Sequence, residues 1–252
     1  MPRASDYLLE GYTYHLTQRC HNREFLLGWA KDRDVYREWL RQGVKRHGVS
    51  VYGFSITGNH VHILAHVDSV EAVSSLMHLA SGATAKRYNL RTRRTGSMWQ
   101  HPYQCTIVED GRHLLNCLTY IDMNMVRAGV VAHPSEWRWC GHDELVGSRK
   151  RYRILDIGRL LQSLGVSSEE ALRRYYTEAI EARTEAESRQ RESHWTTSLA
   201  VGSEDFVNRT KEEYKRRWTF DLRRMSGAHD NVWTIREDRS SYNATSPPPE
   251  GL

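Results

Sequence analysis

The chain has 252 residues, of which 39% are hydrophobic and 27% are charged, and its formal net charge is +5. This length fits one large domain or two smaller ones, with enough apolar residues for a core. No apolar run approaches the ~18 residues of a membrane-spanning helix. The start of the chain, MPRASDYLLEG, lacks the apolar segment of a signal peptide. We therefore expect a cytoplasmic protein without a membrane partner.

The cysteines and the basic residues narrow the class of protein further. Cys20, Cys105, Cys117 and Cys140 form no C-x-x-C pair, so we predict reduced thiols, mostly in the core, rather than a zinc ribbon or a disulfide framework. Basic residues cluster in RTRR, RKRYR and KEEYKRR. Such clusters favour a polyanionic partner, most simply nucleic acid. Composition alone leaves ordinary solvated helix faces as an equal alternative.

The first half of the chain predicts strands that alternate with helices. In chain order, the patterns predict strand 11–19, helix 31–46, strands 49–57 and 60–67, helix 69–90, strand 103–109 and helix 110–127. Asp110 would open the last helix, and Gly129 lies near its end. The first six elements match the ferredoxin-like split β-α-β pattern. We therefore predict an α+β fold, a ferredoxin-like βαββαβ sheet with one extra helix.

The second half of the chain predicts mainly helices. Residues 133–147 carry proline, glycine and aromatic residues, which indicates a packed connection, and helices are expected within 154–190 and at 203–225. The polar, proline-rich end predicts disorder. We therefore predict a first domain over 1–140, a helical accessory region over 141–238 and a disordered tail over 239–252.

The segment GNHVHILAHV places three histidines in an apolar strand. Because residues two apart in a strand point to the same face, His60 and His62 present their imidazoles side by side, as a divalent metal site requires. His66 shares this face but lies about 13 Å beyond His62, which makes it a weaker ligand candidate. Taken alone, the pair is better explained as two paired surface or core histidines, and an unrelated metal hydrolase can use the same His-x-His pattern.

A second group of chemically able residues lies in CLTYIDMNMVRAGVV. Tyr120 and Asn124 are four residues apart, so on a helix they stack on one face. An amide oxygen is a suitable ligand for a hard metal ion. A phenol is a poor nucleophile near neutral pH, but it becomes useful when a metal ion polarises the electrophile. Alone, Tyr120 is better explained as a core aromatic residue with a hydrogen-bonded hydroxyl.

These motifs together resemble one family of enzymes. The segments YHLTQRCHNREFLL, GNHVHIL, MWQHPY and YIDMNMVRAGVV, in this order and spacing, are similar to those of the HUH single-tyrosine (IS200-like) transposases, and most to the REP-associated tyrosine transposases. The likeness covers roughly residues 8–140. Two positions depart from the family pattern: Met125 stands where a proline is common, and Cys20 stands where a glycine is usual. Neither departure removes a residue to which the family assigns a role.

The resemblance implies a reaction and the residues that perform it. It implies metal-dependent cleavage and rejoining of single-stranded DNA in the first domain, with His60, His62 and Asn124 as ligands of Mg²⁺ or Mn²⁺. Tyr120 would be the nucleophile and form a 5′-phosphotyrosine. The expected partner is single-stranded or hairpin DNA formed by REP-like palindromes, bound by a monomer or homodimer in a bacterial cytoplasm at the nucleoid. The alternative within this resemblance is a domesticated protein that binds hairpin DNA or RNA without turnover.

Further residues are candidates for contact with DNA. Arginines close to the motifs can bind phosphates, and aromatic or amide side chains can stack on or bond to unpaired bases. The candidates are Arg19, Arg23, Arg91, Arg93, Arg94, Trp99, Gln100 and His101. For each of them, a solvated or packed side chain is an equally good reading of the sequence.

Overall fold

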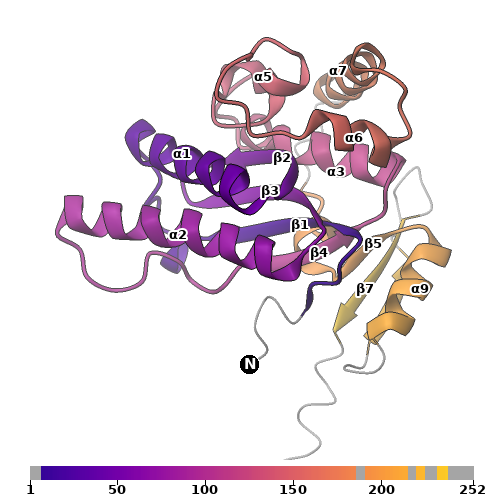
Figure 1. Cartoon of the computed structure of the whole chain (residues 1–252), viewed down its shortest axis with the longest axis horizontal. Coiled ribbons are helices and arrows are strands. Elements are labelled where there is room, and N and C mark those ends of the chain that lie inside the picture. Colours follow the sequence, from indigo (N-terminus) through magenta and orange to yellow (C-terminus); the bar gives the residue numbers. More distant parts are fainter. Residues whose placement is uncertain (1–6, 186–190, 215–219, 225–231, 238–252) are drawn as a thin grey trace, which may run out of the picture.

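The computed structural model describes residues 7–185, 191–214, 220–224 and 232–237, in which a sheet is covered by helices (Figure 1). The strands are β1 (Tyr12–Arg19), β2 (Ser50–Ile56), β3 (His60–Val67), β4 (Gln104–Val108), β5 (Ala200–Gly202), β6 (Phe220–Arg224) and β7 (Trp233–Glu237). The α-helices are α1 (Ala30–His47), α2 (Val70–Thr92), α3 (Arg112–Asp122), α4 (Asn124–Arg127), α5 (His142–Leu145), α6 (Ile157–Leu164), α7 (Glu169–Glu185), α8 (His194–Thr197) and α9 (Glu204–Tyr214). Two short 3-10 turns are η2 (His21–Arg23) and η3 (Pro134–Glu136).

Within these residues the strands form one sheet in the order β2-β3-β1-β4-β5-β7-β6. Strand β3 runs antiparallel to both of its neighbours, and β4 runs antiparallel to β1. Because β3 lies between β2 and β1, the unit β1-α1-β2 is split, as the element order β-α-β-β-α-β predicts. The predicted α+β class is confirmed.

The register of β1 and β3 decides which side chains share a face. Arg19 pairs with His60, Thr17 with His62, and His15 with Leu64. Side chains of paired residues point to the same face, whereas the next residue along each strand points to the other. We call the face that carries His15, His60 and His62 the histidine face.

Different helices cover the two faces of the sheet. Helices α1 and α2 lie side by side on the face opposite the histidines (Figure 1), where Ser81 of α2 bonds to Gln18 of β1. We call this the α1/α2 face. Helix α3 packs on the histidine face, and Gly53 of β2 permits its close approach. A Cβ at position 53 would lie only 2.5 Å from Leu118 Cδ1 of α3.

The predicted helix 110–127 forms with two differences. Helix α3 begins after Gly111, which has a φ of +72°, and the side chain of Asp110 accepts a hydrogen bond from Thr13 Oγ1 instead of capping the helix. Helix α4 continues the direction of α3 after Met123, and Arg127 N still bonds to Met123 O at 2.9 Å. The chain leaves the helix at Gly129, which has a φ of +67°, as predicted.

The sequence predicts helices for the region 141–238, and its described residues form helices and three strands. Strand β5 pairs in parallel with β4, so this region extends the sheet of the first domain. The helix predicted at 203–225 is too long, since α9 ends at Tyr214 and residues 220–224 form β6. Pairing with β7 overrides the local helical pattern there. The predicted disordered tail, 239–252, lies outside the described residues.

The structure bears on two expectations from the sequence, which concern the cysteines and membrane-spanning helices. Cys20, Cys105, Cys117 and Cys140 are all buried and unbridged, as predicted. Among the described residues, no helix combines the length and the apolar character needed to cross a membrane.

Candidate metal and nucleophile site

Four residues from two distant segments meet on the histidine face. His60 and His62 come from β3, and their ring centroids are 4.8 Å apart. Tyr120 is in the last turn of α3 and Asn124 begins α4. Asn124 Nδ2 lies 3.0 Å from His62 Nε2, and the Tyr120 ring centroid lies 6.3 Å from that of His62. One chain therefore brings together the residues that the sequence selects.

The two histidine rings are held by their Nδ1 atoms. His60 Nδ1 lies 2.7 Å from Asn59 Oδ1 in the β2–β3 turn. His62 Nδ1 lies 2.8 Å from Nε2 of His15 on the neighbouring strand. The two Nε2 atoms are therefore the nitrogens that these contacts leave for a ligand.

The site favours neutral imidazoles. Burial lowers the pKa of His60 to about 3, and the nearby cations Arg19, Arg191 and Arg127 act in the same direction. Burial, followed by the proximity of His60 and His15, holds the pKa of His62 well below its usual range. A neutral imidazole carries the lone pair that a metal ion needs, whereas an imidazolium does not.

Tyr120 is enclosed by aromatic and basic side chains. Only 2% of its surface is exposed. The guanidinium carbon of Arg127 lies 4.0 Å from the centre of its ring, and the ring of Trp195 lies 6.1 Å away. Burial raises the pKa of Tyr120, and Arg127 and Arg191 oppose that rise because a cation stabilises a phenolate.

Two alternatives for the histidines can be compared with this geometry. His66 does not join the pair, since its Nδ1 lies 3.3 Å from Thr13 Oγ1 near the other end of β3. The described residues contain no group of three histidine, cysteine or acidic side chains able to hold a metal ion. Asp122 bonds to Tyr176 and Asp68 pairs with Arg159. These two aspartates, one just after β3 and one at the end of α3, are thus engaged with other side chains.

Three residues of the site have no role in the predictions from sequence. His15 and Arg127 lie within the motifs YHLTQR and MVRAG, so the motifs themselves were the available signal. No sequence signal pointed to Trp195, because it lies 180 residues from His15, the histidine that its carbonyl contacts. Contacts of this kind depend on tertiary packing.

Some of the predicted DNA-contacting residues gather at the His60 end of the sheet. Arg19 faces His60 across the β1–β3 pair and is half-buried, and Gln100 N bonds to Arg19 O at 2.9 Å. Arg23 is exposed, and its carbonyl accepts a hydrogen bond from Asn59 of the β2–β3 turn. His101 is exposed next to Gln100 in the chain. These predicted DNA-contacting residues therefore lie together at the His60 end of the sheet.

Two of the predicted DNA-contacting residues, Trp99 and Arg91, are engaged with other parts of the fold. Trp99 is buried, with its Nε1 donating to Ser81 O and its ring 5.8 Å from that of Tyr36. Trp99 thus packs within the core and uses its indole nitrogen inside the protein. The guanidinium of Arg91 binds both carboxylate oxygens of Asp32 at 2.6 and 2.7 Å. Both residues therefore have structural partners.

Arg93 and Arg94 lie just past the end of α2. Arg93 is exposed and has a φ of +53° at the helix C-cap. Arg94 is half-buried, and its side chain donates to Ser97 O at 2.9 Å. Arg93 is thus the more accessible of the two cations.

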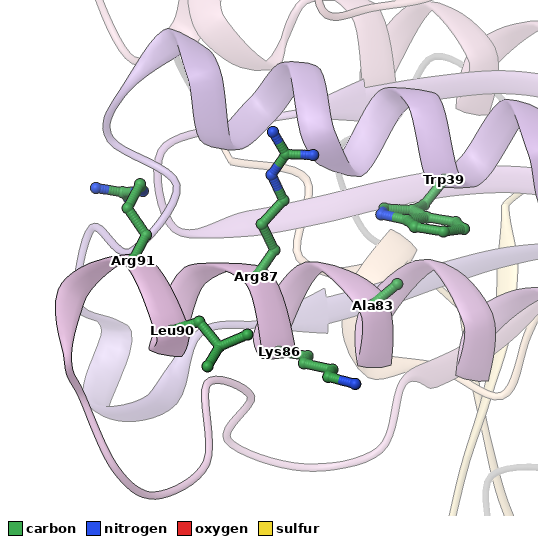
Figure 2. A pocket seen from close by; sticks show the side chains of 6 residues that line it. All are labelled: Trp39, Ala83, Lys86, Arg87, Leu90 and Arg91. Carbon is green, nitrogen blue, oxygen red and sulfur yellow. The ribbon is translucent and has the colours of Figure 1, made fainter.

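A hollow of about 640 Å³ lies between α1 and α2, away from the histidines. Figure 2 shows that α1 contributes Trp39 to its wall and that α2 contributes the other five lining residues: Ala83, Lys86, Arg87, Leu90 and Arg91. The sheet separates this hollow from His62, because α1 and α2 cover the opposite face. It therefore contributes nothing to the chemistry of the four residues described above.

Comparisons with known proteins agree with the sequence motifs. Residues 9–124 match the family described as transposase IS200 like. A search of curated proteins finds no match. A similar solved structure is described as a REP-associated tyrosine transposase bound to a REP hairpin. It has 14% identity to this chain and a TM-score of 0.44, and the likeness covers 59% of this chain and 90% of that one. The family match spans His60, His62, Tyr120 and Asn124, so the part of the chain that resembles the IS200-like transposases contains all four residues of the site.

Proposed function

We propose that the protein is a metal-assisted nuclease and strand transferase that acts on hairpin-forming, single-stranded DNA, as a member of the REP-associated branch. Tyr120 is the nucleophile, and His60, His62 and Asn124 are the metal ligands. The observation that carries this proposal is the 3.0 Å approach of Asn124 to His62, with Tyr120 on the same helical segment beside them. Residues about 60 positions apart in the chain thereby form one site.

The donor set fits a hard divalent ion such as Mg²⁺ or Mn²⁺. Two neutral imidazoles offer Nε2 lone pairs, and a half-turn of the Asn124 amide presents Oδ1 in place of Nδ2. Each ring is fixed through Nδ1 by a second group, as is usual for metal-bound histidines. When bound, such an ion supplies positive charge to the non-bridging oxygens of the scissile phosphate.

The chain's own residues account for the covalent step. Tyr120 Oη attacks the phosphorus, the bond between the phosphorus and the 3′ oxygen breaks, and a 5′-phosphotyrosine bond forms. The proton lost by the phenol passes, through water, to the leaving 3′ oxygen, which becomes a 3′-hydroxyl. Arg127, stacked on the ring at 4.0 Å, favours the developing phenolate. Arg19 and Arg23, at the His60 end of the sheet, would bind neighbouring phosphates. The phosphotyrosine ester conserves the energy of the broken phosphodiester bond. Rejoining therefore requires no nucleotide cofactor.

One observation favours the binding-only alternative. Only 2% of the Tyr120 surface is exposed, and the ring of Trp195 lies 6.1 Å from the Tyr120 ring, which limits the room for a phosphate beside it. If the protein cleaves DNA, we expect α8 to move away from the Tyr120 ring when DNA binds. For hairpin binding without turnover, no such movement is needed.

A covalent-adduct experiment separates the two functions. Labelled single-stranded hairpin DNA from repeats beside the gene is incubated with the protein and Mg²⁺ or Mn²⁺, and then run on a denaturing protein gel. We expect a metal-dependent adduct with the native protein and none with Tyr120→Phe. Tyr175→Phe, which changes an exposed tyrosine on α7, is the matched control and should form the adduct normally. Hairpin binding on a native gel without any adduct would support the binding-only function.

A further inference from the structure

A line of hydrogen-bonding groups runs from α8 to the proposed metal ligands. His15 on β1 is completely buried. Its Nδ1 lies 2.7 Å from the carbonyl oxygen of Trp195, and its Nε2 lies 2.8 Å from Nδ1 of His62. The planes of the two imidazoles are within 20° of parallel. His62 Nε2 then meets Asn124 Nδ2 at 3.0 Å.

The chemistry of these groups fixes the position of each proton. A carbonyl oxygen only accepts hydrogen bonds, so His15 Nδ1 carries a hydrogen and donates it to Trp195. Complete burial favours a neutral His15, whose Nε2 is then an acceptor. His62 Nδ1 must therefore be the donor in the bond between the rings. A neutral His62 that is protonated on Nδ1 has its lone pair on Nε2, the atom that faces Asn124.

We propose that His15 is a positioning residue that holds His62 in the tautomer with Nε2 free for the metal ion, and that the Trp195 carbonyl fixes His15 in turn. This inference rests on the proposed function, since it assigns a purpose to the Nε2 lone pair. His60 reaches the same state through a different partner, because Asn59 Oδ1 accepts from its Nδ1. Both ligand histidines thus present Nε2.

The proposal gives the C-terminal region a part in the site. Strand β3 alone aligns His60 and His62, but the partner of the His15 ring comes from α8, 180 residues further along the chain. The same α8 residue packs its indole ring on Tyr120. The position of α8 is thereby linked to the orientation of a proposed ligand.

Nitrogen-15 NMR of histidine-labelled, metal-free protein tests the tautomer directly. Long-range proton–nitrogen spectra distinguish a protonated from an unprotonated ring nitrogen. We expect His62 of the native protein to be protonated on Nδ1. In His15→Phe, which keeps a planar ring but removes the acceptor, we expect a mixture of tautomers or protonation on Nε2. A native His62 that is protonated on Nε2, or an unchanged tautomer in His15→Phe, would overturn the proposal.

Mn²⁺ binding, followed by electron paramagnetic resonance without DNA, tests the consequence for the metal. Loss of a group that orients a ligand typically weakens metal binding about 10- to 100-fold, and we expect this for His15→Phe. His15→Gln should recover part of the affinity, because its amide oxygen can accept from His62 Nδ1. His66→Gln, a change on the same strand away from the site, should bind as the native protein does. Equal affinities for His15→Phe and His66→Gln would contradict the proposal.

Two controls keep the conclusions separate. Far-ultraviolet circular dichroism and the melting temperature show whether His15→Phe is folded, and His15→Gln provides a second variant if it is not. If native protein binds no Mn²⁺ while His62 is protonated on Nδ1, the metal assignment of the proposed function fails and the tautomer assignment stands. If Mn²⁺ binds but the tautomer differs, the role of His15 fails and the proposed function stands.

Discussion

Both faces of the central sheet are buried, but one buries apolar side chains and the other buries histidines. On the α1/α2 face, Leu16 and Ile63 are completely buried among apolar side chains. On the histidine face, His15 and His62 are buried almost as fully, and each of their ring nitrogens has a polar partner. A buried polar group without a partner is costly, so the second face requires fixed positions. Burial stabilises the fold on one face and orients the site on the other.

Substitutions of two neighbouring residues of β3 should have the largest effects and test the difference between the two faces. His62 and Ile63 are adjacent and buried but point to opposite faces. We expect His62→Gln to remove detectable Mn²⁺ binding and adduct formation while the protein remains folded. We expect Ile63→Ala to lower the free energy of unfolding by about 2–5 kcal/mol, because it leaves a cavity, and to retain adduct formation in the folded fraction.

Urea denaturation and the adduct gel on both variants make the measurement. The comparison between the faces would fail if Ile63→Ala, at a temperature where it is folded, lost the adduct as fully as His62→Gln did.

A buried carboxyl in the helix layer over the histidine face gives a pH-dependent test. Burial raises the pKa of Asp122 from 3.8 to about 7, although Tyr176 donates a hydrogen bond to it. A carboxyl with a raised folded-state pKa contributes stability that is present below its unfolded pKa and lost as the pH rises through its folded pKa. Between pH 4 and 8, the native protein should lose up to about 4 kcal/mol of stability relative to Asp122→Asn.

Urea denaturation of the native protein and Asp122→Asn at pH 5 and pH 8 measures this difference. Identical changes of the unfolding free energy with pH in both proteins would show that Asp122 is not the group responsible.

The stacked pair of Arg127 and Tyr120 allows a smaller test of the electrostatics on the histidine face. Removal of the guanidinium should let burial raise the pKa of Tyr120 further. We expect Arg127→Leu to slow adduct formation about 10- to 100-fold, with less loss at high pH, where more phenolate is present. Arg127→Lys should recover only part of the rate, since an ammonium group does not stack as a guanidinium does.

Adduct rates of the native protein and both variants between pH 7 and pH 10 provide the measurement. A rate for Arg127→Leu that falls equally at every pH would argue for a packing role instead.

On the α1/α2 side, substitutions of two arginines should have the smallest effects. They test whether each arginine stabilises the fold or binds DNA. Arg91 is held by the buried carboxylate of Asp32, whereas Arg93 is exposed. Arg91→Ala should lower stability by about 1–2 kcal/mol, because it leaves that carboxylate without its partner. Arg93→Asn, which tolerates the positive φ, should leave stability unchanged.

Hairpin affinity measured over a range of salt concentrations completes this comparison. If Arg93 binds a phosphate, its loss should reduce the slope of log affinity against log salt by about one. A native salt slope in Arg93→Asn would remove this residue from the proposed DNA surface.

Much of the first domain was predictable from the sequence, since its signals are local. Strand alternation placed His60 and His62 on one face, and helical spacing placed Tyr120 near Asn124. The hairpin between β2 and β3 followed from the turn signal at Gly58 and Asn59. The sequence also matched the order and spacing of a family's motifs, so the candidate nucleophile and candidate ligands were identified before the structure showed them close together.

Tertiary structure alone decided which distant groups complete the site. Local patterns carry no information about the contact of His15 with Trp195, the pairing of β5 with β4 or the burial of Trp99. Each depends on how separate elements pack after they form. Hydrophobic periods of two and 3.6 residues define which face of a single strand or helix is buried. Which of these faces pack together depends on the sum of many weak contacts between distant elements.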